Sequence, residues 1–116
     1  MTTLSSRDVV DVDLGVPTGR EAGFRHPAVV VTAQRVLDET PNVIHVVPLT
    51  SRLRDFRSEV LVDSDAGSGL DRPSSAQCQH VRSVAVARVG DPRGTVGAVT
   101  LSRIRETIGL LLDIGA

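Results

Sequence analysis

The chain has 116 residues, which is enough for one domain with a modest hydrophobic core and too few for two. Its net charge of −1 argues against a protein that coats nucleic acid indiscriminately, because such binding depends on many phosphate contacts. With two Phe and neither Trp nor Tyr, the core must be built from Val, Leu and Ile, and this composition favours strands. We therefore expect residues 1–116 to form a single, mainly β domain.

Cysteine usage and hydropathy predict the compartment. Cys78 is the single cysteine, so an intrachain disulfide is excluded, and no basic-then-apolar leader opens the chain. No apolar run approaches the roughly 20 residues that span a bilayer. These features predict a soluble, cytoplasmic protein with no membrane partner. Because the chain is short, we also expect a homodimer that buries more apolar surface.

The first half of the chain contains three predicted strands. Residues 7–14 alternate apolar and polar side chains, which predicts a strand with one solvent-exposed face. Residues 27–32 and 42–49 are nearly continuous apolar runs that are typical of central strands, and residues 33–39 predict a short turn or helical piece between them. His45 interrupts the second run, and we interpret it as a core histidine whose hydrogen bonds are satisfied.

Further strands and one helix are predicted in the second half. The strands occupy residues 58–63, 74–84 and 94–99, with a loop over residues 63–69 and a turn at Asp91-Pro92 before the last strand. Thr100 is the predicted N-cap of the helix and Gly115 its predicted C-terminal stop. The apolar stripe of this helix consists of Leu101, Ile104, Ile108 and Leu111.

About six short strands and one terminal amphipathic helix predict an α+β, mainly β fold. The arrangement we expect is a small, SH3-like curled antiparallel barrel with the C-terminal helix lying across it. An open α+β sheet is the alternative.

Two charged loops, residues 15–26 and 50–57, follow predicted strands, and binding or catalytic residues are often found in such positions. In a meander, the ends of the first and third strands can meet at one rim. Such a rim would bring a carboxylate, a guanidinium, an imidazole and hydroxyl groups together: Glu21, Arg25 and His26 on one side, and Thr50, Ser51, Arg52 and Arg54 on the other. This set suits cleavage of RNA by its own 2′-hydroxyl. Such cleavage needs groups that transfer protons and cationic donors that stabilise the charge of the phosphorane, and it needs no metal.

The order and spacing of these segments resemble the MazF/PemK family of toxin endoribonucleases. The resemblance covers almost the whole chain, and its main segments are the charged loop 15–27, the strand Pro27-Ala28-Val29-Val30-Val31, Pro48-Leu49-Thr50-Ser51 and the closing helix. In the family, an arginine just before the proline of the second strand has the catalytic role, and the first Thr of a Pro-x-Thr-[Thr/Ser] motif is its hydroxyl partner. The resemblance implies a CcdB/PemK-like fold, and it implies catalytic roles for Thr50 and, by its place in a Gly-x-Glu segment, for Glu21.

The chain departs from the family pattern at Arg25-His26-Pro27, where His26 stands in place of the arginine. Either Arg25 takes over the arginine's work, or His26 becomes the acid/base group and Arg25 binds phosphate. Histidine titrates near neutral pH, so the second option is chemically sensible. A weakened or inactive toxin is a third option, and a half-exposed His26 that only hydrogen-bonds the backbone is a fourth.

A second departure lies at Gln79-His80, where the family has Asp-Gln or Glu-Gln. The family carboxylate would form an ion pair with the family arginine, so its absence here fits the replacement of that arginine by His26. Arginine planes and aromatic rings commonly stack on unpaired bases, so the predicted RNA-binding residues are Arg20, Phe24, Ser51, Arg52, Arg54, Phe56, Arg57 and Gln79. An ordinary solvated loop with local ion pairs, and phenylalanines that anchor the loops to the core, remain the alternatives.

No metal or other cofactor is expected, because Cys78, His80, His26 and His45 lack the ligand spacing of a zinc site. The resemblance implies the toxin of a type II toxin–antitoxin system: a metal-independent, sequence-selective endoribonuclease, dimeric and inhibited by a MazE-like antitoxin. Such an enzyme cuts single-stranded RNA to leave a 2′,3′-cyclic phosphate and a 5′-hydroxyl. The alternatives are a catalytically degenerate relative and a CcdB-like gyrase inhibitor. The second is disfavoured because the C-terminal tail has no Trp.

Overall fold

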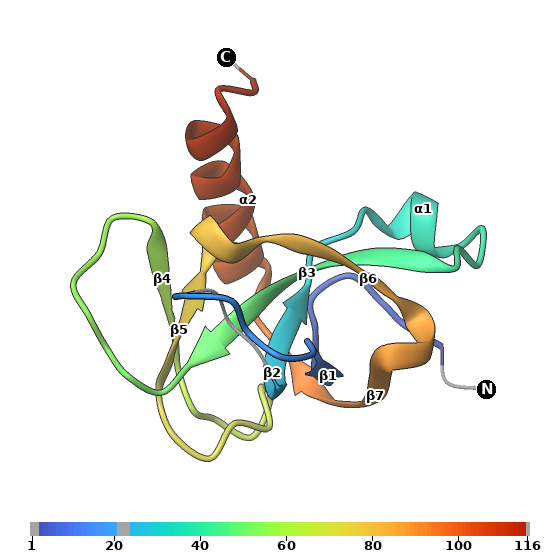
Figure 1. Cartoon of the computed structure of the whole chain (residues 1–116), viewed down its shortest axis with the longest axis horizontal. Helices are drawn as coiled ribbons and strands as arrows, with labels where there is room; N and C mark the ends of the chain where they lie inside the picture. The colour runs from blue at the N-terminus through green and yellow to red at the C-terminus, as the bar shows by residue number, and fades with distance from the viewer. Residues whose placement is uncertain (1–2, 21–23, 116) are drawn as a thin grey trace.

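Seven strands form one curled antiparallel sheet in the computed structural model, which describes residues 3–20 and 24–115 (Figure 1). The strands are β1 (Asp8–Asp13), β2 (Arg25–Val30), β3 (Val43–Thr50), β4 (Glu59–Val62), β5 (Ser74–Gln77), β6 (Arg82–Ala85) and β7 (Val89–Thr95). The helices are α1 (Gln34–Leu37) and α2 (Ala98–Leu112), and the 3₁₀ turns are η1 (Cys78–His80) and η2 (Val86–Arg88).

The sheet is ordered β4-β5-β3-β2-β1-β7, with β6 as an additional partner of β3. One edge of β3 pairs with β2, while the other edge pairs with β6 along Val43–Val46 and with β5 at Leu49 and Thr50. Because one edge of β3 serves two different strands, the sheet curls around it. The path through the described strands starts at β4 and ends at β7 without closing, so the predicted curled, mainly β fold with a C-terminal helix is confirmed as an incompletely closed barrel.

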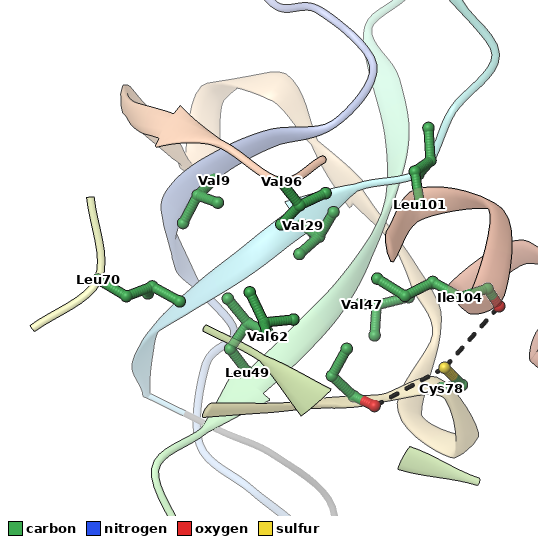
Figure 2. Close-up of a cluster of buried hydrophobic side chains, with 11 residues drawn as sticks. Val9, Val29, Val47, Leu49, Val62, Leu70, Cys78, Val96, Leu101 and Ile104 are labelled. Carbon is green, nitrogen blue, oxygen red and sulfur yellow. Dashed lines mark hydrogen bonds between the residues drawn. The ribbon is translucent and has the colours of Figure 1, made fainter. Parts of the chain in front are cut away.

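Both faces of the central strands are buried where β1, β2 and β3 pair, which explains their nearly continuous apolar runs. Side chains alternate between the two faces of a strand, so Val9, Val29 and Val47 enter one cluster while Val10, Val30 and Val46 enter another. Figure 2 shows the first cluster, in which Leu101 and Ile104 of α2 pack over the sheet. Ile108 is partly buried against the same cluster, so the first three residues of the apolar stripe hold the helix, while Leu111 is exposed.

Cys78 lies inside this first cluster and is fully buried (Figure 2). Its Sγ atom is 3.7 Å from the carbonyl oxygen of Ala76 and 3.9 Å from that of Ile104. Burial raises the pKa of the Cys78 thiol to about 11, and the nearby Glu59 carboxylate adds to this rise. Cys78 therefore acts as a small core residue that links η1 to α2.

Several element boundaries differ from the sequence-based predictions. The predicted strand 74–84 is interrupted by η1, because β5 and β6 pair with different parts of β3. The last strand is Val89–Thr95, and Pro92 lies within it, opposite Val10, where the register with β1 shifts. A proline, which has no N–H to donate, is tolerated at such an irregular edge strand, so the predicted turn at Asp91-Pro92 and the predicted strand 94–99 were wrong.

The ends of α2 also differ from the predicted ones. The helix begins after Gly97, with no side-chain cap, and Thr100 lies inside its first turn. It ends at Leu112 because Asp113 adopts the left-handed conformation, with φ 56°, two residues before the predicted stop at Gly115. His45 was also misassigned: its side chain is exposed, and its backbone N–H donates to the Thr32 hydroxyl.

The loop between β4 and β5 lies directly against β7, and two glycines make this contact possible. A Cβ atom at Gly69, where φ is +68°, would lie 2.3 Å from the carbonyl oxygen of Arg93. A Cβ atom at Gly94 would lie 2.2 Å from the carbonyl oxygen of Gly67. The backbone N–H of Thr95 donates to this same oxygen at 2.7 Å. The contact fixes where the following residues of the loop are placed.

The substitution Gly94→Ala tests this backbone contact. Its methyl group would meet the backbone of the loop, which must then move, so we expect a loss of about 1–3 kcal/mol in the free energy of unfolding, measured in urea. The control is Gly97→Ala, where an added Cβ has no atom within 4 Å. Because Gly97 precedes the helix, the control is expected to cost less than about 1 kcal/mol. Equal losses in both variants would contradict the close packing at Gly94.

Candidate functional site

A cleft of about 300 Å³ opens where β3 ends and β2 begins. Four segments line it: the start of β2, the end of β3, the loop that leads into β5, and β7. Their lining residues are Arg25, His26, Pro27, Leu49, Thr50, Ser51, Leu70, Asp71, Arg72, Ser74 and Arg93. The antiparallel pairing of β2 with β3 thus brings four predicted site residues, Arg25, His26, Thr50 and Ser51, into one cleft.

His26 is half-buried and is oriented by the backbone of β3. Its Nδ1 atom lies 3.2 Å from the carbonyl oxygen of Leu49. A carbonyl oxygen only accepts, so Nδ1 carries the proton in this contact, and in the neutral ring Nε2 keeps its lone pair. The backbone contact expected in one alternative is therefore present, and it leaves the second ring nitrogen able to accept a proton.

Thr50 ends β3, and its hydroxyl group takes part in the turn that follows. Its Oγ1 atom accepts a hydrogen bond of 3.1 Å from the backbone N–H of Arg52. This bond uses a lone pair of the oxygen and leaves the hydroxyl proton free to be donated. Thr50 is thus held in place as a donor at the cleft.

Arg25 extends from the exposed start of β2 toward β7. It pairs in register with Asp13 of β1, and its Nη2 atom lies 3.2 Å from the position that a Cβ atom would take at Gly90. The guanidinium therefore crosses over a glycine, which leaves room for it. Arg25 adds a positive charge to the cleft beside His26.

Three of the predicted RNA-binding residues are engaged with one another around Glu59, outside the cleft lining. The Glu59 carboxylate is 1% exposed, and its Oε2 atom lies 2.5 Å from Arg54 Nη2 and 2.8 Å from Gln79 Nε2. The Arg54 guanidinium carbon lies 4.5 Å from the centre of the Phe56 ring. Gln79, which lies in η1 and stands where the family has a carboxylate, is thus hydrogen-bonded to a carboxylate from β4.

The remaining predicted residues are distributed around the site. Arg52 and Arg57 are exposed on the β3–β4 loop, and Arg20 and Phe24 are exposed on the β1–β2 loop; none of the four lines the cleft. Glu21 lies outside the described residues.

Asp71, Arg72 and Arg93 line the cleft but are absent from the sequence-based set. The first two follow the Gly-rich loop 63–69 and precede β5, so the criterion of charged loops beside strands could have found them. Arg93 could not be found in this way, because the turn predicted at Asp91-Pro92 concealed its position within a strand.

Within the two described ranges, no group of three or more His, Cys, Asp and Glu side chains is placed to hold a metal ion. In the same ranges, neither helix combines the length and hydropathy that crossing a bilayer requires.

The fold is that of the MazF toxins. The structure of MazF from Deinococcus radiodurans superposes with a TM-score of 0.83 at 22% identity, covering 98% of this chain and all of that one (100%). The Mycobacterium tuberculosis toxin MazF-mt6 superposes with a TM-score of 0.75 at 23% identity, covering 95% of this chain and 100% of that one.

Sequence comparison agrees with the structural one. Residues 5–112 match the family model described as "PemK-like, MazF-like toxin of type II toxin-antitoxin system". The chain is 33% identical over 111 residues to Endoribonuclease MazF9 of Mycobacterium tuberculosis, covering 92% of this chain and 94% of that protein. It is 31% identical over 88 residues to Endoribonuclease MazF3 of the same organism, covering 76% of this chain and 82% of that protein. The chain therefore belongs to the PemK-like, MazF-like family of type II toxins, which confirms the resemblance read from the sequence.

The substitution Glu59→Gln tests whether the cluster around Glu59 supports the fold. It would leave Arg54 without its ion-pair partner, and because Arg54 is 29% exposed, solvent screening limits the expected cost to about 1–2 kcal/mol of unfolding free energy. Urea denaturation measures this cost, with the exposed Glu39→Gln as the matched control. If both variants unfold at the wild-type urea concentration, the cluster does not stabilise the fold.

Proposed function

We propose that this MazF-like toxin is an endoribonuclease that cuts single-stranded RNA in the cleft at the start of β2 and the end of β3. The observation that carries the proposal is the convergence of an imidazole, a hydroxyl group and a guanidinium: His26, Thr50 and Arg25 line the same cleft. The names of its relatives support the reaction class, since MazF9 and MazF3 are both called endoribonucleases. The RNA's own 2′-hydroxyl is the nucleophile, so no metal ion is required.

His26 Nε2 removes the proton of the 2′-hydroxyl, whose oxygen attacks the adjacent phosphorus. The bond from phosphorus to the 5′-oxygen of the next nucleotide then breaks, that oxygen takes up a proton from solvent water, and the protonated His26 returns its proton to the solvent. The products are a 2′,3′-cyclic phosphate and a 5′-hydroxyl. Thr50 donates a hydrogen bond to the phosphoryl group, and Arg25 stabilises the charge that develops on it.

The first test is to incubate the protein with mixed single-stranded RNAs in excess EDTA and to sequence the cut ends. We expect cleavage at a short sequence with cyclic-phosphate ends. EDTA should not prevent it, because the RNA supplies the nucleophile and protein side chains activate it. Thr50→Ala and His26→Ala should each lower the single-turnover rate by about 100-fold or more. Ser64→Ala, a control in an exposed loop, should leave the rate unchanged. Wild-type protein that leaves all RNAs intact would point instead to a degenerate toxin or to a gyrase-type poison.

The pH dependence of the rate separates His26 from Arg25 as the proton acceptor. A general base must be neutral to accept a proton, so with His26 in this role the single-turnover rate should have an acidic limb along which it rises with pH. This limb should vanish in His26→Ala. A wild-type profile without the limb would assign the family arginine's work to Arg25.

We further propose that the chain works as a cytoplasmic homodimer bound by a MazE-like antitoxin. The end of α2 supports an interface, because Leu110 is 78% exposed and Ile114 66% exposed. A second cleft, of about 540 Å³, lies between this helix end and the β3–β4 loop, where Phe56 is also exposed. Contiguous exposed apolar groups of this kind mark interaction sites. The fold is shared with MazE–MazF complexes from Deinococcus radiodurans, with a TM-score of 0.76 at 20% identity for one of them.

Light scattering coupled to size exclusion tests the dimer. The wild type should show twice the 12.3 kDa mass of one chain, and Leu110→Asp should shift it toward the monomer by placing a charge in the apolar interface. Val36→Asp, at an exposed position on α1, is the control and should remain dimeric. A wild type that elutes as a monomer at micromolar concentration would refute the dimer.

A further inference from the structure

One wall of the cleft consists of charged residues that the proposed reaction does not use: Asp71 and Arg72 from the loop before β5, and Arg93 from β7. The loop reaches this position because its backbone lies on β7 at Gly69 and Gly94. Ser68, which is 2% exposed, fixes the loop from inside: its hydroxyl donates to the carbonyl oxygen of Asp63, and its N–H donates to the Asp65 carboxylate. The wall is therefore a built part of the fold.

Within this wall, the Arg93 side chain lies between the loop before β5 and strand β1. Its Nη1 atom lies 3.3 Å from the Asp11 carboxylate of β1, and its Nη2 atom lies 3.7 Å from the Asp71 carboxylate. The planar fork of an arginine can face two carboxylates at once, which the single ammonium of lysine does less well. Arg93 thus pairs with two carboxylates, of which Asp71 of the loop is 91% exposed, and the loop backbone at Gly69 lies against the carbonyl oxygen of Arg93.

Arg72 differs from Arg93 in its surroundings. It is exposed at the cleft, and no carboxylate of the described residues forms an ion pair with it. Arg25 is the other cleft arginine without such a pair, and the proposed reaction assigns it to the phosphate that is cleaved. RNA carries one charged phosphate per nucleotide, so a strand in the cleft brings further phosphates near Arg72.

We propose that Arg72 binds a backbone phosphate of the RNA other than the one that is cleaved, and that Arg93 is a positioning residue that holds the loop carrying Arg72. A phosphate is the fitting ligand because Arg72 is exposed, whereas reading a base edge calls for a more enclosed site. The inference rests on the proposed function, which makes RNA the ligand of this cleft.

Binding of a 2′-O-methyl RNA tests the role of Arg72, since this RNA lacks the attacking hydroxyl and stays intact. Fluorescence anisotropy at several KCl concentrations gives the slope of log affinity against log salt. Each phosphate contact to a single strand contributes about 0.7 to that slope, so Arg72→Gln should make it shallower by about 0.7. The same variant should weaken binding to RNAs of different sequence by a similar factor.

Arg103→Gln is the matched control, because Arg103 is exposed on α2 and does not line the cleft. It should leave the slope unchanged. An unchanged slope in Arg72→Gln would overturn the proposal, and so would a loss of affinity confined to RNAs that differ at one base.

A double-mutant cycle tests the role of Arg93. If Arg93 acts only through the loop, Arg93→Gln weakens binding, and the variant with both substitutions binds no more weakly than Arg72→Gln alone. Losses that add, with a second decrease of about 0.7 in the salt slope, would show that Arg93 contacts the RNA directly and would overturn its positioning role.

The same measurements separate this inference from the proposed reaction. A wild type that binds RNA without cutting it would refute the proposed cleavage and leave the result at Arg72 standing. A wild type that binds no RNA would overturn both.

Discussion

Strand β3 is the constraint on which the rest of the structure depends. It offers one edge to β2 and divides the other edge between β6 and β5, so the sheet must curl at this strand. The division also places the end of β3 at the rim, next to the start of β2. Thr50 and His26 meet there because of backbone pairing, and the carbonyl oxygen of Leu49 orients the His26 ring. The candidate site is thus a direct product of the hydrogen-bond register.

Charge pairing decides which arginines are available for RNA. All thirteen basic residues are arginines, yet the net charge is −1, so arginine content alone says little about binding. Arg54 is engaged by the buried Glu59, and Arg93 lies between Asp11 and Asp71. The arginines that line the cleft without an ion pair to a described carboxylate are Arg25 and Arg72. A cleft with few uncompensated cations favours selective binding of one strand over general attraction to nucleic acid.

The Glu59 cluster also bears on the two departures from the family pattern. Gln79 replaces the carboxylate that the family has at this position. Its side-chain amide donates a hydrogen bond to Glu59, which also accepts one from Arg54. A carboxylate–arginine pair is therefore present in this chain, at positions other than those the family motif would give. It does not involve His26, which lies in the cleft with one ring nitrogen free of the backbone contact.

The sequence by itself determined the features that depend on near neighbours. Alternation predicted β1, apolar runs predicted β2 and β3, and helical spacing predicted α2. The order of the motifs predicted the family, and a meander of strands predicted the meeting of Arg25 and His26 with Thr50 and Ser51. Local periodicity carries this information because a strand or helix repeats over a few residues. Only the tertiary structure decided that Pro92 lies in a strand and that His45 is exposed. It also decided the pairs Arg93–Asp11 and Gln79–Glu59, which join residues 82 and 20 positions apart, because such contacts depend on the register between distant strands.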